Sequence, residues 1–116
     1  MMKKLILIFS VFTMVACQPP RNVQISRFAE TMDRSVGRVL SSVDIEVLKK
    51  NYTVSLNKID ANITRYYIKM DNPNYIGGKG CEIYRDIDNR TNKIIRWHYI
   101  SSADKCRSKI GWSGPW

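Results

Sequence analysis

The stretch CEIYRDIDNRTNKIIRWHYIS, residues 81–101, decides the fold of this chain. Residues 81–87 and 93–101 are rich in aromatic and β-branched side chains, which favour strands. The polar residues 88–92 between them are typical of a hairpin turn. The stretch therefore predicts two antiparallel strands joined by a short turn.

Alternation inside the second of these strands predicts how the sheet packs. Ile95, Trp97 and Tyr99 occupy alternate positions and therefore share one face of the strand. They alternate with Ile94, Arg96, His98 and Ile100 on the opposite face. We expect one of the two faces to pack on a helix and the other to be wetter.

Two more strands are predicted upstream of this hairpin. Apolar and polar residues alternate over residues 52–56, and residues 63–70 again combine aromatic and β-branched types. Residues 57–62 between them are typical of a turn. Residues 71–80 contain one proline, three glycines and two asparagines, which predicts an irregular loop. Strands in this order favour a four-stranded antiparallel meander.

A helical pattern begins at Ser26, which can cap a helix. Gly37 and the pair Ser41 and Ser42 weaken its middle, which predicts a break near residues 41–43, with one continuous helix as the alternative. The expected fold is thus α+β, with one or two N-terminal helices packed on the meander. The apolar residues of the pattern recur every three or four positions and are expected to face the core: Phe28, Met32, Val36, Val39, Leu40, Val43 and Val47.

The start of the chain has the pattern of an export signal. Lys3 and Lys4 precede residues 5–16, an apolar run interrupted by Ser10 and Thr13. A helix of this length spans about 18 Å, short of the roughly 30 Å hydrocarbon core of a bilayer, so we expect no transmembrane helix. The charge, length and small-residue end match a secretory signal peptide.

Residues 14–17, Met-Val-Ala-Cys, resemble the cleavage box of bacterial lipoproteins, with methionine where leucine is usual. The resemblance implies that residues 1–16 are removed and that Cys17 becomes a lipid-bearing N-terminus, a stable membrane anchor. In Gram-negative members, aspartate after the cysteine retains the protein in the inner membrane. Gln18 therefore favours the outer membrane, with the domain facing the periplasm. Plain secretion and an uncleaved anchor are the alternatives.

The mature chain has room for one small domain. Removal of residues 1–16 leaves 100 residues and lowers the net charge from +9 to about +7. Residues 17–25, polar and proline-rich after the cysteine, are expected to form a tether, and residues 26–116 a single α+β domain.

The predicted compartment limits which anionic partners the positively charged chain can meet. Export removes nucleic acid as a partner and leaves anionic envelope components within reach. Charge spread over the surface for solubility is the plainer interpretation, because the chain has no block of five like charges.

The chain has three cysteines, and export predicts a different role for one of them than for the other two. With Cys17 carrying lipid, Cys81 and Cys106 are expected to form a disulfide in an oxidising compartment. No metal site is expected because His98 is the only histidine. No cofactor is expected either.

Catalytic or ligand-binding patterns are weak in this sequence. His98 has no nucleophile placed beside it by the sequence. Residues 77–80, Gly-Gly-Lys-Gly, lack the spacing of a phosphate-binding loop. Asp86, Asp88 and Asn92 lack the other ligands of a calcium loop, so ordinary turn chemistry is the better interpretation. We do not expect an enzyme.

Aromatic residues near the C-terminus offer a possible contact surface. Trp112 and Trp116, together with Tyr75, are candidates for contact with a partner or with the membrane interface. The alternative is that they cover the open end of a small core.

Residues 26–106, with helices before an antiparallel meander and a cysteine pair, resemble the SmpA/BamE-type outer-membrane lipoproteins. That family serves the machinery that inserts β-barrels. Its Gly-Met-Thr helix start and its Gly-x-Pro are absent here, so no site residues are carried over. We therefore expect a non-catalytic envelope lipoprotein that binds or scaffolds another envelope component, in outer-membrane assembly.

Two other functions remain as alternatives. The first is a small periplasmic inhibitor, like the lipoproteins that block lysozyme, although basic targets would repel a basic inhibitor. The second is an accessory subunit of a secretion, conjugation or phage-exclusion system.

Overall fold

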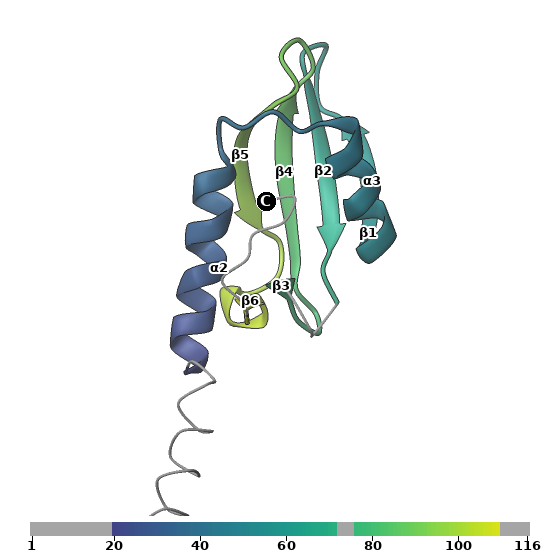
Figure 1. Cartoon of the computed structure of the whole chain (residues 1–116). Coiled ribbons are helices and arrows are strands. Elements are labelled where there is room, and N and C mark those ends of the chain that lie inside the picture. The colour runs from purple at the N-terminus through teal and green to yellow at the C-terminus, as the bar shows by residue number, and fades with distance from the viewer. Residues whose placement is uncertain (1–19, 72–75, 110–116) are drawn as a thin grey trace, which may run out of the picture.

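The computed structural model describes residues 20–71 and 76–109 of the chain (Figure 1). Its main layer is a four-stranded antiparallel sheet in the order β1-β2-β4-β5. The predicted α+β class and the predicted meander are therefore confirmed. The strands of this sheet are β1 (Thr53–Lys58), β2 (Ile63–Lys69), β4 (Glu82–Asp88) and β5 (Lys93–Tyr99).

The cross-strand register divides the side chains of the sheet between two faces. Ile68 of β2 lies opposite Ile83 of β4, which lies opposite Tyr99 of β5. These residues share a buried core with Phe28 and Leu48 of the two helices. We call this helix-covered side the inner face and the opposite side the outer face.

The helices α2 (Arg21–Ser35) and α3 (Ser42–Asn51) pack near opposite edges of the sheet, α2 beside β5 and α3 beside β1 (Figure 1). The ring of Phe28 stacks against Tyr99 with centroids 6.0 Å apart and meets Trp97 edge-on at 6.1 Å. The aromatic residues of β5 thus pack on a helix as predicted. Neither α2 nor α3, the helices of the described residues, is long and apolar enough to cross a membrane.

The predicted tether is wrong over its last five residues, because α2 begins at Arg21. Pro20 occupies the N-cap position with φ −57°, and its carbonyl accepts the backbone N–H of Gln24 at 3.1 Å. The fixed φ of proline suits the start of a helix, where a missing N–H costs little. Val23 and Ile25 are half-buried, so burial also favours helix in this segment.

The two helices are confirmed, but the break between them comes earlier than predicted. α2 ends at Ser35 and is followed by Gly37 at φ +91°, a backbone conformation that favours glycine. The chain then runs along the edge of β5, where the N–H of Gly37 donates to the carbonyl of Ile94 at 2.7 Å. The next helix begins at a capping box formed by Ser41 and Asp44.

This extended connection corrects part of the predicted apolar stripe. Val36, Val39 and Val43 are 41%, 55% and 66% exposed, whereas Leu40 is buried. The helical period does not continue past Gly37, so these valines do not share the face of Phe28.

A β-bulge corrects the alternation predicted for β5. Asp86 lies opposite Arg96, but the next residue, Ile87, lies opposite Ile94. The additional residue, Ile95, shifts the alternation, so Ile94 enters the core in its place.

Part of the predicted irregular loop belongs to a second, two-stranded sheet. β3 (Ile76–Gly77) pairs with β6 (Arg107–Ser108), which follows the 3₁₀ helix η1 (Ala103–Lys105). The Sγ atoms of Cys81 and Cys106 lie 2.03 Å apart, and both cysteines are fully buried. The predicted disulfide is confirmed and ties the start of β4 to the segment before β6.

Candidate functional site

The outer face carries charged, hydroxyl-bearing and aromatic side chains in rows that cross the strands. The register defines an arginine row of Asn57, Arg65, Asp86 and Arg96. The same register defines an aromatic row of Ser55, Tyr67, Tyr84 and His98. A third row begins with Thr53, Lys69 and Glu82, and the carbonyl of Glu82 accepts the N–H of Ile100.

The arginine row is organised by one carboxylate. Asp86 is fully buried although it lies on the face opposite the helices. Arg65 donates from Nε to Oδ1 at 2.8 Å and from Nη2 to Oδ2 at 3.0 Å. Arg96 donates from Nε to the same Oδ2 at 2.6 Å. Two guanidinium groups from flanking strands therefore meet on one buried aspartate.

The ionisation of these groups follows from the hydrogen bonds. Burial raises the pKa of Asp86, but hydrogen bonds from Arg65 and Arg96 outweigh burial and hold that pKa below its usual value. The hydrogen bond to Asp86 raises the pKa of Arg65. All three groups are charged at neutral pH, and the cluster keeps one net positive charge.

The aromatic row is connected to the arginine row by stacking. The guanidinium carbon of Arg65 lies 3.9 Å from the ring centroid of Tyr84. Tyr84 also meets Tyr67 edge-on at 6.3 Å between centroids and His98 at 5.3 Å. The position of Arg65 is thus set both by a carboxylate and by an aromatic ring.

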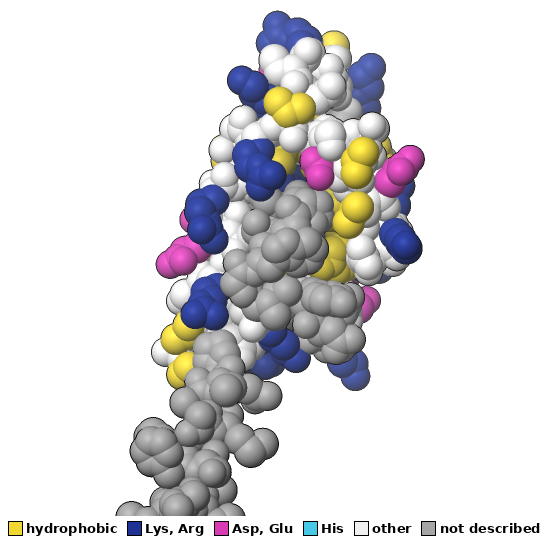
Figure 2. All heavy atoms as spheres, in the orientation of Figure 1, with side chains coloured by type: hydrophobic (Ala, Val, Ile, Leu, Met, Phe, Trp, Pro, Cys, Tyr) yellow, Lys and Arg dark blue, Asp and Glu magenta, His cyan; other side chains and the backbone are white. Residues whose placement is uncertain are grey.

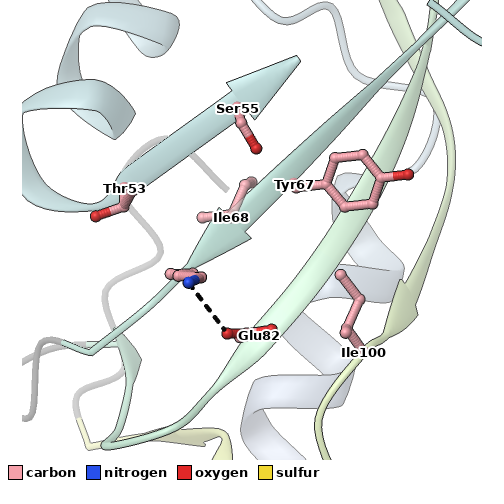
Figure 3. Close-up of a pocket in the computed structure, with 7 residues that line it drawn as sticks. Thr53, Ser55, Tyr67, Ile68, Glu82 and Ile100 are labelled. Atoms are coloured by element: carbon pink, nitrogen blue, oxygen red, sulfur yellow. Dashed lines mark ion pairs between the residues drawn. The ribbon is translucent and has the colours of Figure 1, made fainter. Parts of the chain in front are cut away.

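A pocket of about 310 Å³ lies beside the aromatic row (Figure 3). Tyr67 belongs to both the row and the pocket. Lys69 and Glu82 form an ion pair at its edge, with Nζ and Oε1 3.8 Å apart. The lining combines hydroxyl groups, apolar surface and this ion pair: Thr53, Ser55, Tyr67, Ile68, Lys69, Glu82 and Ile100.

The inner face of β4 holds a second buried charged side chain. Arg85 is 1% exposed. The pKa of Arg85 is lowered to about 10, chiefly by burial and also by the charge of Arg38, while the charge of Asp44 partly offsets these effects. β4 therefore carries one buried charged residue on each face, Arg85 on the inner face and Asp86 on the outer face. Asp86 forms a compact ion cluster with Arg65 and Arg96.

The basic side chains visible on the helix-covered side do not form one patch. Figure 2 shows Lys and Arg side chains distributed along α2, over α3 and at the end of the sheet. The arginine pair of the outer face differs from these because a common carboxylate holds it in place.

The acidic residues named as calcium candidates are engaged in ion pairs in the structure. Asp86 is engaged by two arginines, while Asp88 lies 3.7 Å from Arg90. Asn92 lies in the hairpin turn at φ +57°. Over residues 20–71 and 76–109 no group of three or more His, Cys, Asp or Glu side chains can hold a metal ion.

Of the predicted site residues, Cys81 and Cys106 are brought together. Cys17, the predicted lipid attachment point, lies outside the described residues. The candidate contact residues Tyr75, Trp112 and Trp116 also lie outside them.

The cluster of Arg65, Asp86 and Arg96 was missed at the sequence level. One signal was present, because Asp86 interrupts a strand of aromatic and β-branched residues at a position of the wetter face. Its partners are 21 residues before it and 10 after it in the chain. Pairing them requires the strand register, which includes a bulge beside Asp86.

No family model, no curated protein and no solved structure matches this chain. The resemblance of residues 26–106 to the SmpA/BamE-type lipoproteins therefore stays a prediction.

Proposed function

We propose that this chain is an exported, lipid-anchored and non-catalytic binding protein of the bacterial cell envelope. In this proposal the outer face of the sheet contacts another envelope component. The observation that carries the binding role is the cluster of Arg65 and Arg96 on buried Asp86, beside an aromatic row and a pocket. Positive charge, aromatic surface and hydrogen-bond donors held in fixed positions are means of recognition.

Export and anchoring are supported by two independent features. Residues 1–17 resemble a lipoprotein signal that ends at Cys17. The buried bridge between Cys81 and Cys106 fits an oxidising compartment, since stable disulfides are rare in the cytosol. Gln18 after the cysteine favours the outer membrane, with the domain in the periplasm.

A binding role is favoured over catalysis by the chemistry of the outer face. Its buried carboxylate is paired with two guanidinium groups, which hold it in the ionised form. Such a group is a poor general acid or base at neutral pH, because its pKa is far from the operating pH. The resemblance to SmpA/BamE-type proteins makes the barrel-inserting machinery the first partner to examine.

Photo-crosslinking in intact cells tests the outer face directly. A photoreactive phenylalanine derivative replaces His98, which is exposed at the end of the aromatic row. Lys50, exposed on α3, is replaced in the same way as the matched control. We expect adducts with an envelope component from position 98 and not from position 50. Adducts from position 50 alone, or none from position 98, would contradict the proposal.

Palmitate labelling tests the anchor separately. Radiolabelled palmitate is expected to enter the wild-type chain and not Cys17→Ser. Equal labelling of both chains would refute the anchor, whatever the crosslinking shows.

A further inference from the structure

We propose that Arg65 and Arg96, held together by Asp86, form a binding site for a phosphate monoester carried on a saccharide. This inference deepens the proposed function and rests on the outer face being the binding surface. It concerns the chemistry of the ligand, which the crosslinking experiment does not examine.

The site is preorganised for an anion. Three hydrogen bonds of 2.6 to 3.0 Å hold the two guanidinium groups on one carboxylate, and Tyr84 stacks on Arg65. Long side chains fixed before binding lose little conformational entropy when a ligand arrives. Arg96 uses only its Nε atom for Asp86, so among the described residues both of its Nη groups remain available as donors.

The charge of Asp86 offsets one of the two guanidinium charges, but its side chain is not the surface that an incoming anion meets. Its side chain is fully covered, whereas the side chains of Arg65 and Arg96 are 24% and 46% exposed. A ligand approaching from solvent therefore meets guanidinium groups and not the carboxylate. The cluster presents a net positive charge to that ligand.

The arrangement of donors favours phosphate over carboxylate. A carboxylate has two oxygens in one plane and matches the fork of one guanidinium group, although it can accept from two, as Asp86 does here. A phosphate monoester has three terminal oxygens in a tetrahedral arrangement and accepts from two directions at once. Arg65 and Arg96 reach the site from β2 and β5, on opposite sides of β4, and so supply two directions.

The surface beside the arginine row indicates what carries the phosphate. Adjacent rows on one face of a strand are two residues apart, or about 7 Å. The aromatic row therefore lies about 7 Å from the arginine row, and the row of Lys69 and Glu82 about 14 Å from it. Aromatic rings contact the apolar faces of sugar rings. The hydroxyl groups and the ion pair along the pocket match sugar hydroxyls (Figure 3).

Isothermal titration of the full-length protein in detergent tests this site. The probes are glucose 1-phosphate, inorganic phosphate and, in a parallel flotation assay, phosphatidylcholine vesicles with and without phosphatidic acid. Saturable binding of glucose 1-phosphate, tighter than that of inorganic phosphate, is the expected result. Binding to phosphatidic acid vesicles without binding of glucose 1-phosphate would overturn the saccharide and assign the phosphate to a lipid headgroup.

Paired variants separate a built site from general attraction. Arg96→Gln leaves Asp86 paired with Arg65 and is expected to lower affinity about 10-fold or more. Arg90→Gln removes the same charge from an arginine that is 73% exposed and also paired with an aspartate, and should change affinity less than about 2-fold. Arg96→Lys restores the charge but not the planar fork and should recover only part of the affinity.

Two results would overturn the phosphate site. One is the absence of saturable binding by wild type, and the other is an equal loss in Arg96→Gln and Arg90→Gln. Urea unfolding of each variant shows whether the fold is intact. Failure here with position 98 still crosslinked would leave the outer face as a protein-binding surface, so the two proposals fail separately.

Discussion

The Nε atom of Arg96 donates to Oδ2 of Asp86 across 2.6 Å, and Asp86 is fully buried on the face of the sheet that the helices do not cover. Burying a charge is costly unless it is paired and hydrogen-bonded. Here Arg65 completes the pairing, so the outer face gains a fixed ion cluster at its centre. The stability of the sheet and the anion binding proposed for its outer face therefore depend on the same carboxylate.

Asp86→Asn is expected to lower the free energy of unfolding by about 3 kcal/mol. The substitution leaves two guanidinium groups without their common carboxylate, although both can turn toward solvent. Urea unfolding measures the change. Glu82→Gln is the control on the same strand and face, and its 3.8 Å surface ion pair with Lys69 should contribute less than about 1 kcal/mol. Equal losses in the two variants would contradict a special role for Asp86.

The same carboxylate predicts a pH dependence of stability. The pKa of Asp86 is lower in the folded chain than its ordinary value of 3.8, so the folded state binds this proton less readily than the unfolded state. Its stabilisation is present above that ordinary value and is lost as the pH falls through the folded pKa. The difference in unfolding free energy between wild type and Asp86→Asn should therefore shrink as the pH falls below the ordinary pKa of 3.8. A constant difference from neutral pH downward would contradict this assignment.

Removal of the disulfide is expected to cost about 3.5 kcal/mol, because the bridge constrains the unfolded chain. The bridge joins residues separated by 25 positions, and both sulfur atoms are buried. The double substitution Cys81→Ala and Cys106→Ala is compared with Cys17→Ala, which keeps the bridge. Urea unfolding should show a loss only in the double variant. A thiol assay that found reactive Cys81 and Cys106 in the native protein would contradict the bridge.

Two glycines with positive φ are expected to differ in their tolerance of a side chain. Gly37 has φ +91° and open space around an added Cβ, so Gly37→Ala should cost about 1 kcal/mol of backbone strain. Gly77 has φ +129°, and an added Cβ would collide with the backbone carbonyl of Met70. Gly77→Ala should therefore cost about 3 kcal/mol. Equal unfolding midpoints for the two variants would show that the segment around Gly77 adapts.

The local patterns of the sequence were sufficient to predict the helices and the strands of the main sheet. Residues 63–70 and 81–101 combine period-two alternation with β-branched and aromatic side chains, and each became strand over most of its length. The three cysteines, with Cys17 set aside as the predicted lipid attachment point, were sufficient to predict the bridge. These signals are local or compositional, so they do not depend on how the elements meet.

The predictions from the sequence were wrong where backbone hydrogen bonds to a distant segment outweighed the local preference for helix or loop. The connection after Ser35 leaves the helical pattern because its N–H and carbonyl groups pair with β5. β3 forms because it pairs with β6, about thirty residues further along the chain. Neither partner can be inferred from the residues of the segment itself.

The sequence by itself determined the α+β class, the strand order, the disulfide and the alternation between a core face and a wetter face. Each of these follows from the spacing of apolar residues, the composition or the cysteine content. Only the tertiary structure decided which charges meet on the wetter face. The register of three strands, with a bulge beside Asp86, brings Arg65 and Arg96 onto one buried carboxylate. A shift of one residue in that register would place Asp86 on the core face, and the cluster would not form.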